Sequence, residues 1–406
     1  MTDTERPEGT AWKDKPYLKY YAEWTPHSLE YQDDTMAKLL DRTVAEHSSA
    51  DILDFFGQTM TYGDFLKQVK SVAAGLRELG VRPGDRVAVT LPNCPQHLIT
   101  IFAAHKLGAV VAEHNPLYTA RELEGPCKDH GAKVAVVWDK IAPMFQELSR
   151  TTPLEKIVSV NMIDAMPLVK RLALKLPIKS IKEKRDQLHG EAPGTIPFSQ
   201  LQSAKFGGDG SDIENSPETT QDSPAFILFT SGTTGKPKGA QLTHGNVMSN
   251  VVQGLSWISG IGERGQEKFL AALPLFHIYG LTLTAALAVS TGGKLLLLPK
   301  PEIPLIVDQL KRETPTYMPG VPTLYDKILA AAEEHNLDLH GIANALSGAA
   351  PLPVHTTLEW EKKTGGKIVE GYGLTESGPI LVANPVTPER RAGYILSLIH
   401  ISEPTR

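Results

Sequence analysis

The sequence predicts an α/β fold in which mostly parallel sheets are covered by helices on both faces. Short apolar runs alternate with helical patterns along most of the 406 residues, and strands that alternate with helices in this way form parallel sheets. The composition fits such a fold, with 41% hydrophobic and 21% charged residues. A chain of this length can bury a large core and has room for two or three domains.

The first part of the chain contains the alternating elements in a regular order. Residues 1–32 are polar and weakly periodic, which is typical of an extended arm. A first α/β sub-domain is expected over 33–160, with helices that begin near Asp33 and Thr61 and a third helix over 96–107. Its strands are expected in a hairpin over 51–62 and at 86–91, 109–112 and 134–138.

A different composition marks residues 161–223 as a basic insertion followed by a linker. The segment 166–177 is apolar and basic, and Lys179, Lys182, Lys184 and Arg185 continue its positive charge. Two interpretations stay open: a surface helix over 166–185 that contacts anionic lipid, or a helical insertion that is simply solvated. Residues 190–224 are rich in Gly, Ser, Asp and Pro, which predicts a mobile linker.

The α/β pattern resumes over 224–395, which is expected to form a second sub-domain. Its strands are expected at 225–229, 269–273, 293–298, 316–319 and 343–347. Its helices are expected at 243–258, 279–289, 305–312 and 321–330.

The bulk properties exclude several classes of protein. A net charge of −5, without interleaved basic and aromatic residues, argues against nucleic-acid binding. Cys94 and Cys127 have no metal-binding spacing and are expected to be buried thiols in a reducing compartment. The chain opens on polar residues and contains no apolar run long enough for a membrane span, so a cytoplasmic location is expected.

The most informative stretch is residues 230–239. Nine of its ten residues are Gly, Thr, Ser or Lys, and it follows an apolar run that predicts a buried strand. Such a segment offers backbone N–H groups, hydroxyls and positive charge to a polyphosphate. Gly232 and Gly235 are only three positions apart and Pro237 stands where a P-loop needs a hydroxyl, so the motif is not of the Walker type. We expect a loop between two strands, with the next helix beginning only at Thr243 or His244.

Three later segments add candidate site residues at expected strand ends. Residues 273–280 contain His277, residues 346–353 are small and proline-rich, and residues 369–376 bring together an aromatic ring, a hydroxyl and a carboxylate. Ligands bind at the carboxyl ends of strands in open α/β sheets. Each segment alone also fits a structural histidine, a strand-to-helix turn or an ordinary strand exit.

Taken together, these segments resemble the adenylate-forming superfamily of acyl-CoA synthetases, luciferases and peptide-synthetase adenylation domains, and most of all bacterial long-chain fatty-acid–CoA ligases. The resemblance covers about residues 20–395. It rests on segments in the family's order and spacing, at 91–95, 113–122, 230–239, 274–277, 347–351 and 372–376. It implies the large N-terminal domain of these enzymes, with two αβαβα-type sub-domains, mostly parallel sheets flanked by helices, and a partial β region.

The resemblance also implies a reaction. A carboxylate attacks the α-phosphorus of ATP to give acyl-AMP and pyrophosphate, and the thiolate of coenzyme A then displaces AMP. Mg²⁺ assists, and Glu376 is implied as its ligand. The residues implied in catalysis are Thr230, Thr375 and Glu376. Those implied to bind ATP are Thr230, Ser231, Gly232, Thr233, Thr234, Gly235, Lys236, Lys238, Gly348, Ala349, Ala350, Glu370, Gly371, Tyr372, Gly373 and Thr375. Those implied to border the acyl pocket are His277, Tyr279 and Gly280.

The end of the sequence departs from the family pattern. Family members continue into a ribose-binding Asp, a hinge and a small C-terminal domain with a catalytic lysine, and we expect this chain to lack all of these. Residues 396–406 match no family segment, and they can be back-translated into a string that looks like a transposon end and sequencing adapter. Our hypothesis is that this tail is not native, which sequencing the 3′ end of the gene would test.

Several functional alternatives remain open at this stage. The acid could be a fatty acid or an aryl carboxylate, and the acceptor thiol could belong to coenzyme A or to a carrier protein. A plain nucleotide-binding protein would release ADP rather than AMP, and a non-catalytic fragment would bind ATP weakly. Peripheral membrane contact through 166–185 and the oligomeric state are likewise undecided by the sequence.

Overall fold

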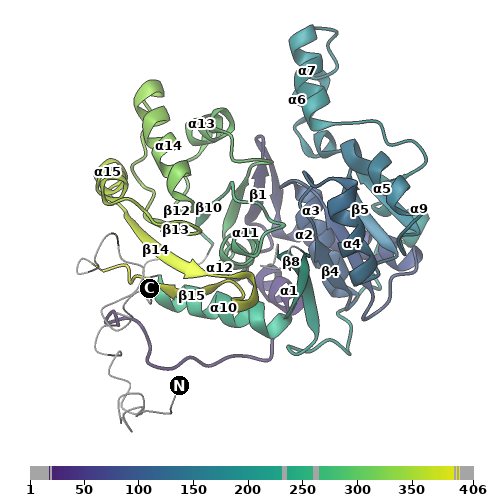
Figure 1. Ribbon diagram of the computed structural model, residues 1–406, viewed down its shortest axis with the longest axis horizontal. Coiled ribbons are helices and arrows are strands. Elements are labelled where there is room, and N and C mark those ends of the chain that lie inside the picture. The colour runs from purple at the N-terminus through teal and green to yellow at the C-terminus, as the bar shows by residue number, and fades with distance from the viewer. Residues whose placement is uncertain are drawn as a thin grey trace.

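Two mostly parallel sheets organise the chain (Figure 1). The computed structural model describes residues 18, 21–230, 236–258, 265–387, 390 and 393, so the expectations for most of the N-terminal arm and for residues 396–406 lie outside the described residues. In these ranges one sheet has seven strands in the order β7-β6-β5-β3-β4-β8-β9, and the other has eight in the order β15-β14-β13-β12-β10-β11-β1-β2. Only the edge strands β9, β15 and β2 run antiparallel to their described neighbours.

The strands are short, as is usual for parallel sheets that are buried on both faces. The seven-stranded sheet consists of β3 (Arg86–Thr90), β4 (Val110–Glu113), β5 (Val134–Trp138), β6 (Lys156–Val160), β7 (Ile196–Pro197), β8 (Pro224–Thr230) and β9 (Lys238–Thr243). The eight-stranded sheet consists of β1 (Asp51–Phe55), β2 (Gln58–Thr61), β10 (Lys268–Ala271), β11 (Lys294–Leu297), β12 (Tyr317–Gly320), β13 (Asn344–Ser347), β14 (Lys367–Gly373) and β15 (Ile380–Ala383).

A shared layer of helices lies between the two sheets. It contains α1 (Met36–His47), α2 (Tyr62–Glu78), α3 (Pro95–Lys106), α10 (His244–Trp257) and α12 (Leu287–Thr291), whose apolar residues form one core with the inner faces of both sheets. All twelve residues of α3 are buried, including polar ones such as His97, His105 and Lys106. The central layer therefore holds the two sheets together.

The outer faces of the sheets have their own helices and cores. The outer core of the seven-stranded sheet is formed with α4 (Ala120–His130) and α5 (Ala142–Leu148). The outer core of the eight-stranded sheet is formed with α13 (Ile303–Arg312), α14 (Pro322–His335) and α15 (Val354–Thr364). The result is a layered α/β architecture, which confirms the predicted fold class.

Most elements lie where the sequence predicts them, with shifts of a few residues at their ends. The hairpin after residue 50, the helix that begins after Thr61 and the strands 86–91 and 134–138 are all present. Thr61 caps α2 by accepting a hydrogen bond from the Asp64 backbone N–H at 3.1 Å. The helix expected over 279–289 runs as α11 (Ile278–Gly280), a π-helical segment (Leu281–Ala286) and α12, and its hydrophobic pattern gives no sign of the π-helical part.

Sheet membership differs from the division at residue 224 that the sequence predicts. Strands β8 and β9 belong to the seven-stranded sheet, where Phe226 pairs with Val111, and β1 pairs with β11 in the other sheet. Pairing between distant strands depends on tertiary packing, and a local change of composition does not reveal it. Each sheet therefore contains strands from both halves of the chain.

The segment predicted as a linker is also more ordered than expected. Phe198 and Leu201 in α8 (Phe198–Leu201) are buried, and the short helix α9 (Ala204–Gly207) follows. The backbone of Leu201 lies so close to α2 that a Cβ at Gly75 would be 2.8 Å from its Cα atom. Residues 190–223 thus pack on the first helices instead of forming a loose connection.

The basic insertion forms two short helices, α6 (Leu168–Ala173) and α7 (Lys179–Leu188), which stand away from the body of the molecule (Figure 1). None of the residues in either helix is buried. Among the described helices, none has both the length and the apolar content that crossing a bilayer requires.

Candidate active site

A pocket of about 580 Å³ lies at the carboxyl ends of β8, β13 and β14. Strand ends of this kind are where open α/β sheets bind ligands. Ten sequence-predicted site residues line the pocket: Thr230, His277, Tyr279, Gly348, Ala349, Gly371, Tyr372, Gly373, Thr375 and Glu376. They come from four separate motifs, so the fold brings together segments that are far apart in the sequence.

Other predicted site residues lie elsewhere. Lys236, Lys238 and Ala350 are exposed outside the pocket lining, and Gly280 is buried behind it. A Cβ at Gly280 would lie 2.2 Å from the Pro274 carbonyl oxygen, so this glycine permits a close approach of two backbone segments. The loop residues Ser231, Gly232, Thr233, Thr234 and Gly235 lie outside the described residues.

Glu370 is also absent from the pocket lining, and its hydrogen bonds indicate that it stabilises the backbone next to the pocket. Its buried carboxylate accepts hydrogen bonds from the backbone N–H groups of Leu352, at 3.0 Å, and Gly393, at 3.1 Å. Because Leu352 follows the turn that carries Gly348 and Ala349, the carboxylate fixes this turn to β14. The sequence-based assignment of Glu370 to direct ATP contact therefore has no support from the pocket geometry.

The strands around the predicted phosphate loop form a hairpin at the edge of the seven-stranded sheet. Thr230 pairs with Lys238 across the antiparallel ladder of β8 and β9. Helix α10 begins only at His244, where Thr243 caps it by accepting a hydrogen bond from the Asn246 backbone N–H at 3.1 Å. This arrangement confirms that the loop lies between two strands and has no helix directly behind it. Strand β9 also packs against the 3₁₀ turn Thr375–Ser377, which brings Thr230 toward Thr375.

One wall of the pocket is the turn after β13. The Gly348 backbone N–H donates to the Gly320 carbonyl at 3.1 Å, which ties this turn to the end of β12. Ala349 has a φ of 67°, a left-handed conformation that costs a non-glycine residue on the order of 1 kcal/mol. The hydroxyl of Ser347 is buried and makes no hydrogen bond within the described part of the chain. The turn therefore combines strained backbone with an unsatisfied polar atom, both common at binding sites.

Tyr279 braces the same wall from α11. Its hydroxyl donates to the Leu346 carbonyl at 2.6 Å. Burial raises the pKa of Tyr279 well above its usual value, so the hydroxyl stays protonated and remains a donor. A Cβ at Gly348 would lie 3.1 Å from the Tyr279 ring, which shows how closely the ring lies against the turn.

The opposite wall is the hairpin of β14 and β15, which carries Tyr372, Thr375 and Glu376. Tyr372 is 50% exposed and lines the pocket, so its ring is accessible to a flat ligand. A Cβ at Gly373 would lie 2.1 Å from the Pro379 carbonyl oxygen, so only glycine fits this position. Leu374 donates its backbone N–H to the same carbonyl at 3.0 Å.

Asn250 holds this hairpin from α10, and the sequence gives no sign of it. Its side-chain amide donates to the Ile380 carbonyl at 3.0 Å, and its side-chain oxygen accepts from the Ile380 backbone N–H at 3.0 Å. The residue is buried. It therefore connects the central helical layer to the strand that follows Thr375 and Glu376.

Asn93 joins the two sheets close to His277. It lies after β3, in the segment 91–95 that contributes to the family resemblance. Its side-chain amide donates to the carbonyls of Ala271, at 3.1 Å, and Leu273, at 2.8 Å, and its oxygen accepts from the Leu275 backbone N–H at 2.8 Å. A side chain from one sheet thus shapes the segment that leads to His277 in the other.

A buried cluster of His114, Cys127 and His130 lies beside Phe229, one residue before Thr230. The Ala132 backbone N–H donates to His130 Nδ1 at 2.9 Å, so a neutral ring carries its proton on Nε2 and donates it to His114 Nε2 at 3.0 Å. Burial lowers the pKa of both imidazoles, to about 4 for His130. Because both Nε2 atoms are engaged in one hydrogen bond, the arrangement favours a structural pair over a metal site.

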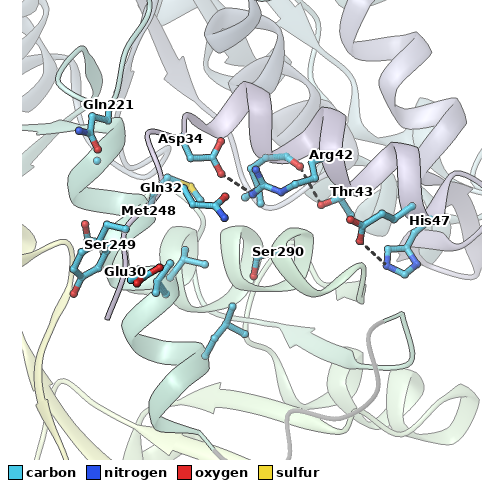
Figure 2. A pocket seen from close by; sticks show the side chains of 17 residues that line it. Glu30, Gln32, Asp34, Arg42, Thr43, His47, Gln221, Met248, Ser249 and Ser290 are labelled. Carbon is cyan, nitrogen blue, oxygen red and sulfur yellow. Dashed lines mark hydrogen bonds and ion pairs between the residues drawn. The ribbon is translucent and has the colours of Figure 1, made fainter. Parts of the chain in front are cut away.

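A second pocket, of about 340 Å³, lies between α1 and α10 (Figure 2). Two pairs of its charged side chains lie close together: Arg42 donates to Asp34 at 2.6 Å, and His47 lies 3.8 Å from the Glu46 carboxylate (Figure 2). None of the predicted site residues lines it. The chemistry therefore concentrates in the first pocket.

The fold and the first pocket together define the N-terminal domain of an adenylate-forming enzyme. Two solved structures share this fold over 90% of the chain: an anthranilate CoA ligase in complex with anthranoyl-AMP, with a TM-score of 0.74 at 21% identity, and a long-chain-fatty-acid-CoA ligase from Archaeoglobus fulgidus, with a TM-score of 0.70 at 22% identity. The chain covers 64% and 69% of these two chains, respectively.

Sequence comparison gives the family. The model of AMP-binding enzymes matches residues 40–400. The long-chain-fatty-acid–CoA ligase of Bacillus subtilis strain 168 is 32% identical over 382 residues, which is 94% of this chain and 67% of the relative. The chain therefore belongs to the AMP-binding enzyme family, among relatives that are acid–thiol ligases.

Proposed function

We propose that this chain takes part in the ATP-dependent activation of a fatty acid. The acid's carboxylate attacks the α-phosphorus of ATP, the α–β phosphate bond breaks, and acyl-AMP and pyrophosphate form. The thiolate of coenzyme A then attacks the acyl carbon and AMP leaves. The observation that carries the proposal is the convergence of Thr230, Tyr372, Thr375 and Glu376, from two different sheets, on one pocket.

In this proposal each wall of the pocket has a separate task. The turn at Gly348 and Ala349 and the accessible ring of Tyr372 bind adenine by backbone contact and stacking. Thr375 donates its hydroxyl to the α-phosphate, and the loop that begins at Thr230 holds the β- and γ-phosphates. Donors placed where negative charge develops are among the largest contributions to catalysis.

Glu376 fits the part of a Mg²⁺ ligand. Carboxylate oxygens are preferred ligands for this ion. The Glu376 side chain borders the pocket and makes no hydrogen bond or ion pair with another described residue. When bound, Mg²⁺ neutralises charge between the carboxylate and phosphate anions.

A fatty acid is supported by the pocket lining and by the relatives. Ile278, Leu283 and Leu346 give the pocket apolar surface next to His277 and Tyr279. The Bacillus subtilis relative is named a long-chain-fatty-acid–CoA ligase. The anthranilate ligase shows that the same fold also accepts an aromatic acid in another protein.

The test is to identify the nucleotide product formed from ATP and Mg²⁺ with a panel of acids that includes palmitate, octanoate and benzoate. The proposal expects AMP and pyrophosphate with the fatty acids, followed by acyl-CoA when coenzyme A is added. Release of ADP would contradict adenylation, and AMP formation with benzoate alone would contradict the fatty-acid substrate. Replacing coenzyme A with a carrier-protein thiol tests the alternative acceptor.

Two variants test the assignment of residues. Thr375→Ala and Glu376→Gln are each expected to lower kcat/KM for AMP formation by roughly 100-fold or more, because each removes one group that stabilises charge in the transition state. Glu359→Gln, an exposed carboxylate on α15, is the matched control and is expected to leave the rate unchanged. Activity that survives both pocket substitutions would overturn the assignment.

A further inference from the structure

The insertion formed by α6 and α7 is fixed to the body at both ends and exposed in the middle. On the side that enters it, Ile163 and Met166 are buried. On the side that leaves it, the Trp138 indole N–H donates to the Leu188 carbonyl at 2.9 Å, and the Asp139 carboxylate accepts from the Gly190 backbone N–H at 3.1 Å. These contacts hold the projection that Figure 1 shows at a fixed place on the surface.

Apolar side chains on this projection are open to solvent. The exposed fractions are 65% for Leu168, 78% for Val169, 55% for Leu172, 48% for Leu176 and 51% for Ile178. Leu168 and Leu172 are four residues apart within α6, which places them on one side of that helix, and Leu176 and Ile178 follow in the connection to α7. Leu174 and Leu188, in contrast, pack against the core of the body. The outward apolar side is therefore distinct from the side that anchors the insertion.

Positive charge surrounds the apolar side. Residues 168–188 contain seven Lys or Arg and two Asp or Glu, a net charge of +5 in a chain whose net charge is −5. Lys170 and Arg171 are directed to the body, where they contact the Phe56 carbonyl at 2.9 Å and the Asp164 carboxylate at 3.5 Å. Lys175, Lys179, Lys182 and Lys184 are exposed and make no ion pair with another described residue. Their ammonium groups are available to an external anionic surface.

We infer that this projection binds the surface of an anionic lipid bilayer. Exposed leucines interleaved with lysines suit the boundary between headgroups and acyl chains, because the apolar side chains enter that boundary and the lysine ammonium groups extend to the lipid phosphates. A flat bilayer needs no matching groove, and the opposite charge of the insertion and the rest of the chain turns the insertion toward the membrane. The inference depends only on this surface and not on the proposed function. If the proposed function also holds, the pocket that activates fatty acids would lie close to the membrane in which such acids dissolve.

Vesicle binding tests the inference without any measurement of activity. The full chain is sedimented with vesicles of phosphatidylcholine alone and with vesicles that contain about 30 mol% phosphatidylglycerol, at low and high salt. The expected result is binding that is at least about tenfold tighter to the anionic vesicles and that weakens at high salt, because exposed charges are screened. Equal binding to both vesicles, or no binding to either, would overturn the inference.

Substitutions locate the surface. The triple variant Lys179→Gln, Lys182→Gln and Lys184→Gln is expected to weaken binding about 100-fold, and the double variant Val169→Ser and Leu172→Ser about tenfold. The matched controls lie on the outer helices of the eight-stranded sheet: Lys311→Gln, Lys327→Gln and Lys362→Gln for the charges, and Val354→Ser with Leu358→Ser for the apolar pair, whose members are 47% and 61% exposed.

These controls separate the insertion from a general effect of charge. All the substituted lysines are exposed, so the thermal unfolding midpoint is expected to stay unchanged in both triple variants. Vesicle binding that the insertion variants leave intact, or that the control variants weaken equally, would show that the lipid does not bind here. The insertion would then be simply a solvated helical pair.

Discussion

Gly373 sets the shape of the wall that carries Tyr372 and Thr375. The Pro379 carbonyl approaches it more closely than any Cβ allows, and this contact closes the short turn between β14 and β15. Glu370, on the same strand, turns inward and fixes the opposite turn through Leu352. Single residues therefore hold the two walls of the pocket at a set distance from each other.

Gly373→Ala is expected to displace the hairpin, because the added Cβ would lie 2.1 Å from a backbone oxygen that has no room to move. AMP formation should fall by roughly 100-fold or more, since misplacing catalytic groups by about 1 Å has effects of this size. The matched control is Gly125→Ala in α4, where no atom lies within 4 Å of the added Cβ and the change favours helix. Full activity in Gly373→Ala would contradict this account of the wall.

At the level of elements, α10 positions the hairpin through Asn250 and through Trp257, whose indole N–H donates to the Asn384 carbonyl at 3.0 Å. The helix thus holds β15 at its first residue, Ile380, and just after its last, at Asn384, more than 120 residues later in the chain. Since α10 belongs to the central layer, movement of that layer would change the pocket.

Asn250→Ala is expected to lower the free energy of unfolding by about 1 to 3 kcal/mol, because it removes a buried amide and the partners of the partly buried N–H and carbonyl of Ile380. The KM for ATP should rise, because the hairpin carries Tyr372 and Thr375. Denaturant titration and initial-rate measurements check the two effects. Ser249→Ala on the same helix, where the half-buried Ser249 hydroxyl makes no hydrogen bond with another described residue, should leave the KM for ATP unchanged. A rise there as large as in Asn250→Ala would argue against a specific clamp.

How far the sequence predicts the structure differs from element to element. Helix α2 was predictable because capping by Thr61 and apolar spacing are local signals. The hairpin around residue 230 was predictable because apolar residues and a Gly-rich turn are adjacent in sequence. The placement of β8 beside β4 and the clamp at Asn250 were not predictable, because each depends on residues that are far apart in the chain. The π-helical segment in 281–286 was not predictable either, because its hydrophobic pattern is that of an ordinary buried helix.

The same distinction holds for the candidate site. Motifs that present side chains at strand ends, such as Thr375 and Glu376, could be picked out from residue type and order. Glu370 has the same chemistry, and only its contact with Leu352 shows that it points away from the pocket. Asn93 lies in segment 91–95, which contributes to the family resemblance. Its hydrogen bonds to carbonyls of the other sheet could not be predicted, because they depend on how the two sheets pack.

On the scale of the whole molecule, buried histidines make the stability depend on pH. Burial lowers the pKa of His105 and of His130 to about 4, and both rings are almost fully buried. Between pH 6.5 and 4 the unfolded chain therefore binds protons that the folded chain does not. The free energy of unfolding should fall as the pH drops through this window, by about 2 kcal/mol per histidine at pH 5.

Denaturant titration at pH 7 and pH 5 checks this expectation. In His105→Gln the difference in stability between the two pH values should shrink by about 2 kcal/mol, whereas His335→Gln, an exposed histidine on α14, should leave it unchanged. Burial raises the pKa of Glu113 and opposes the effect, but equally in all variants. A wild-type stability that is the same at pH 7 and pH 5 would contradict the prediction.

The pairing of β1 with β11 has a consequence for how the protein is made. Leu53 pairs with Leu295, so the N-terminal hairpin finds its place in the eight-stranded sheet only after some 240 further residues have left the ribosome. Two-stranded hairpins are barely stable alone, and long-range pairing is slow and exposes apolar surface. During synthesis the hairpin of β1 and β2 therefore stays unpaired until β11 has been made. The pocket near the other edge of that sheet can form only after β13, β14 and β15 have been synthesised.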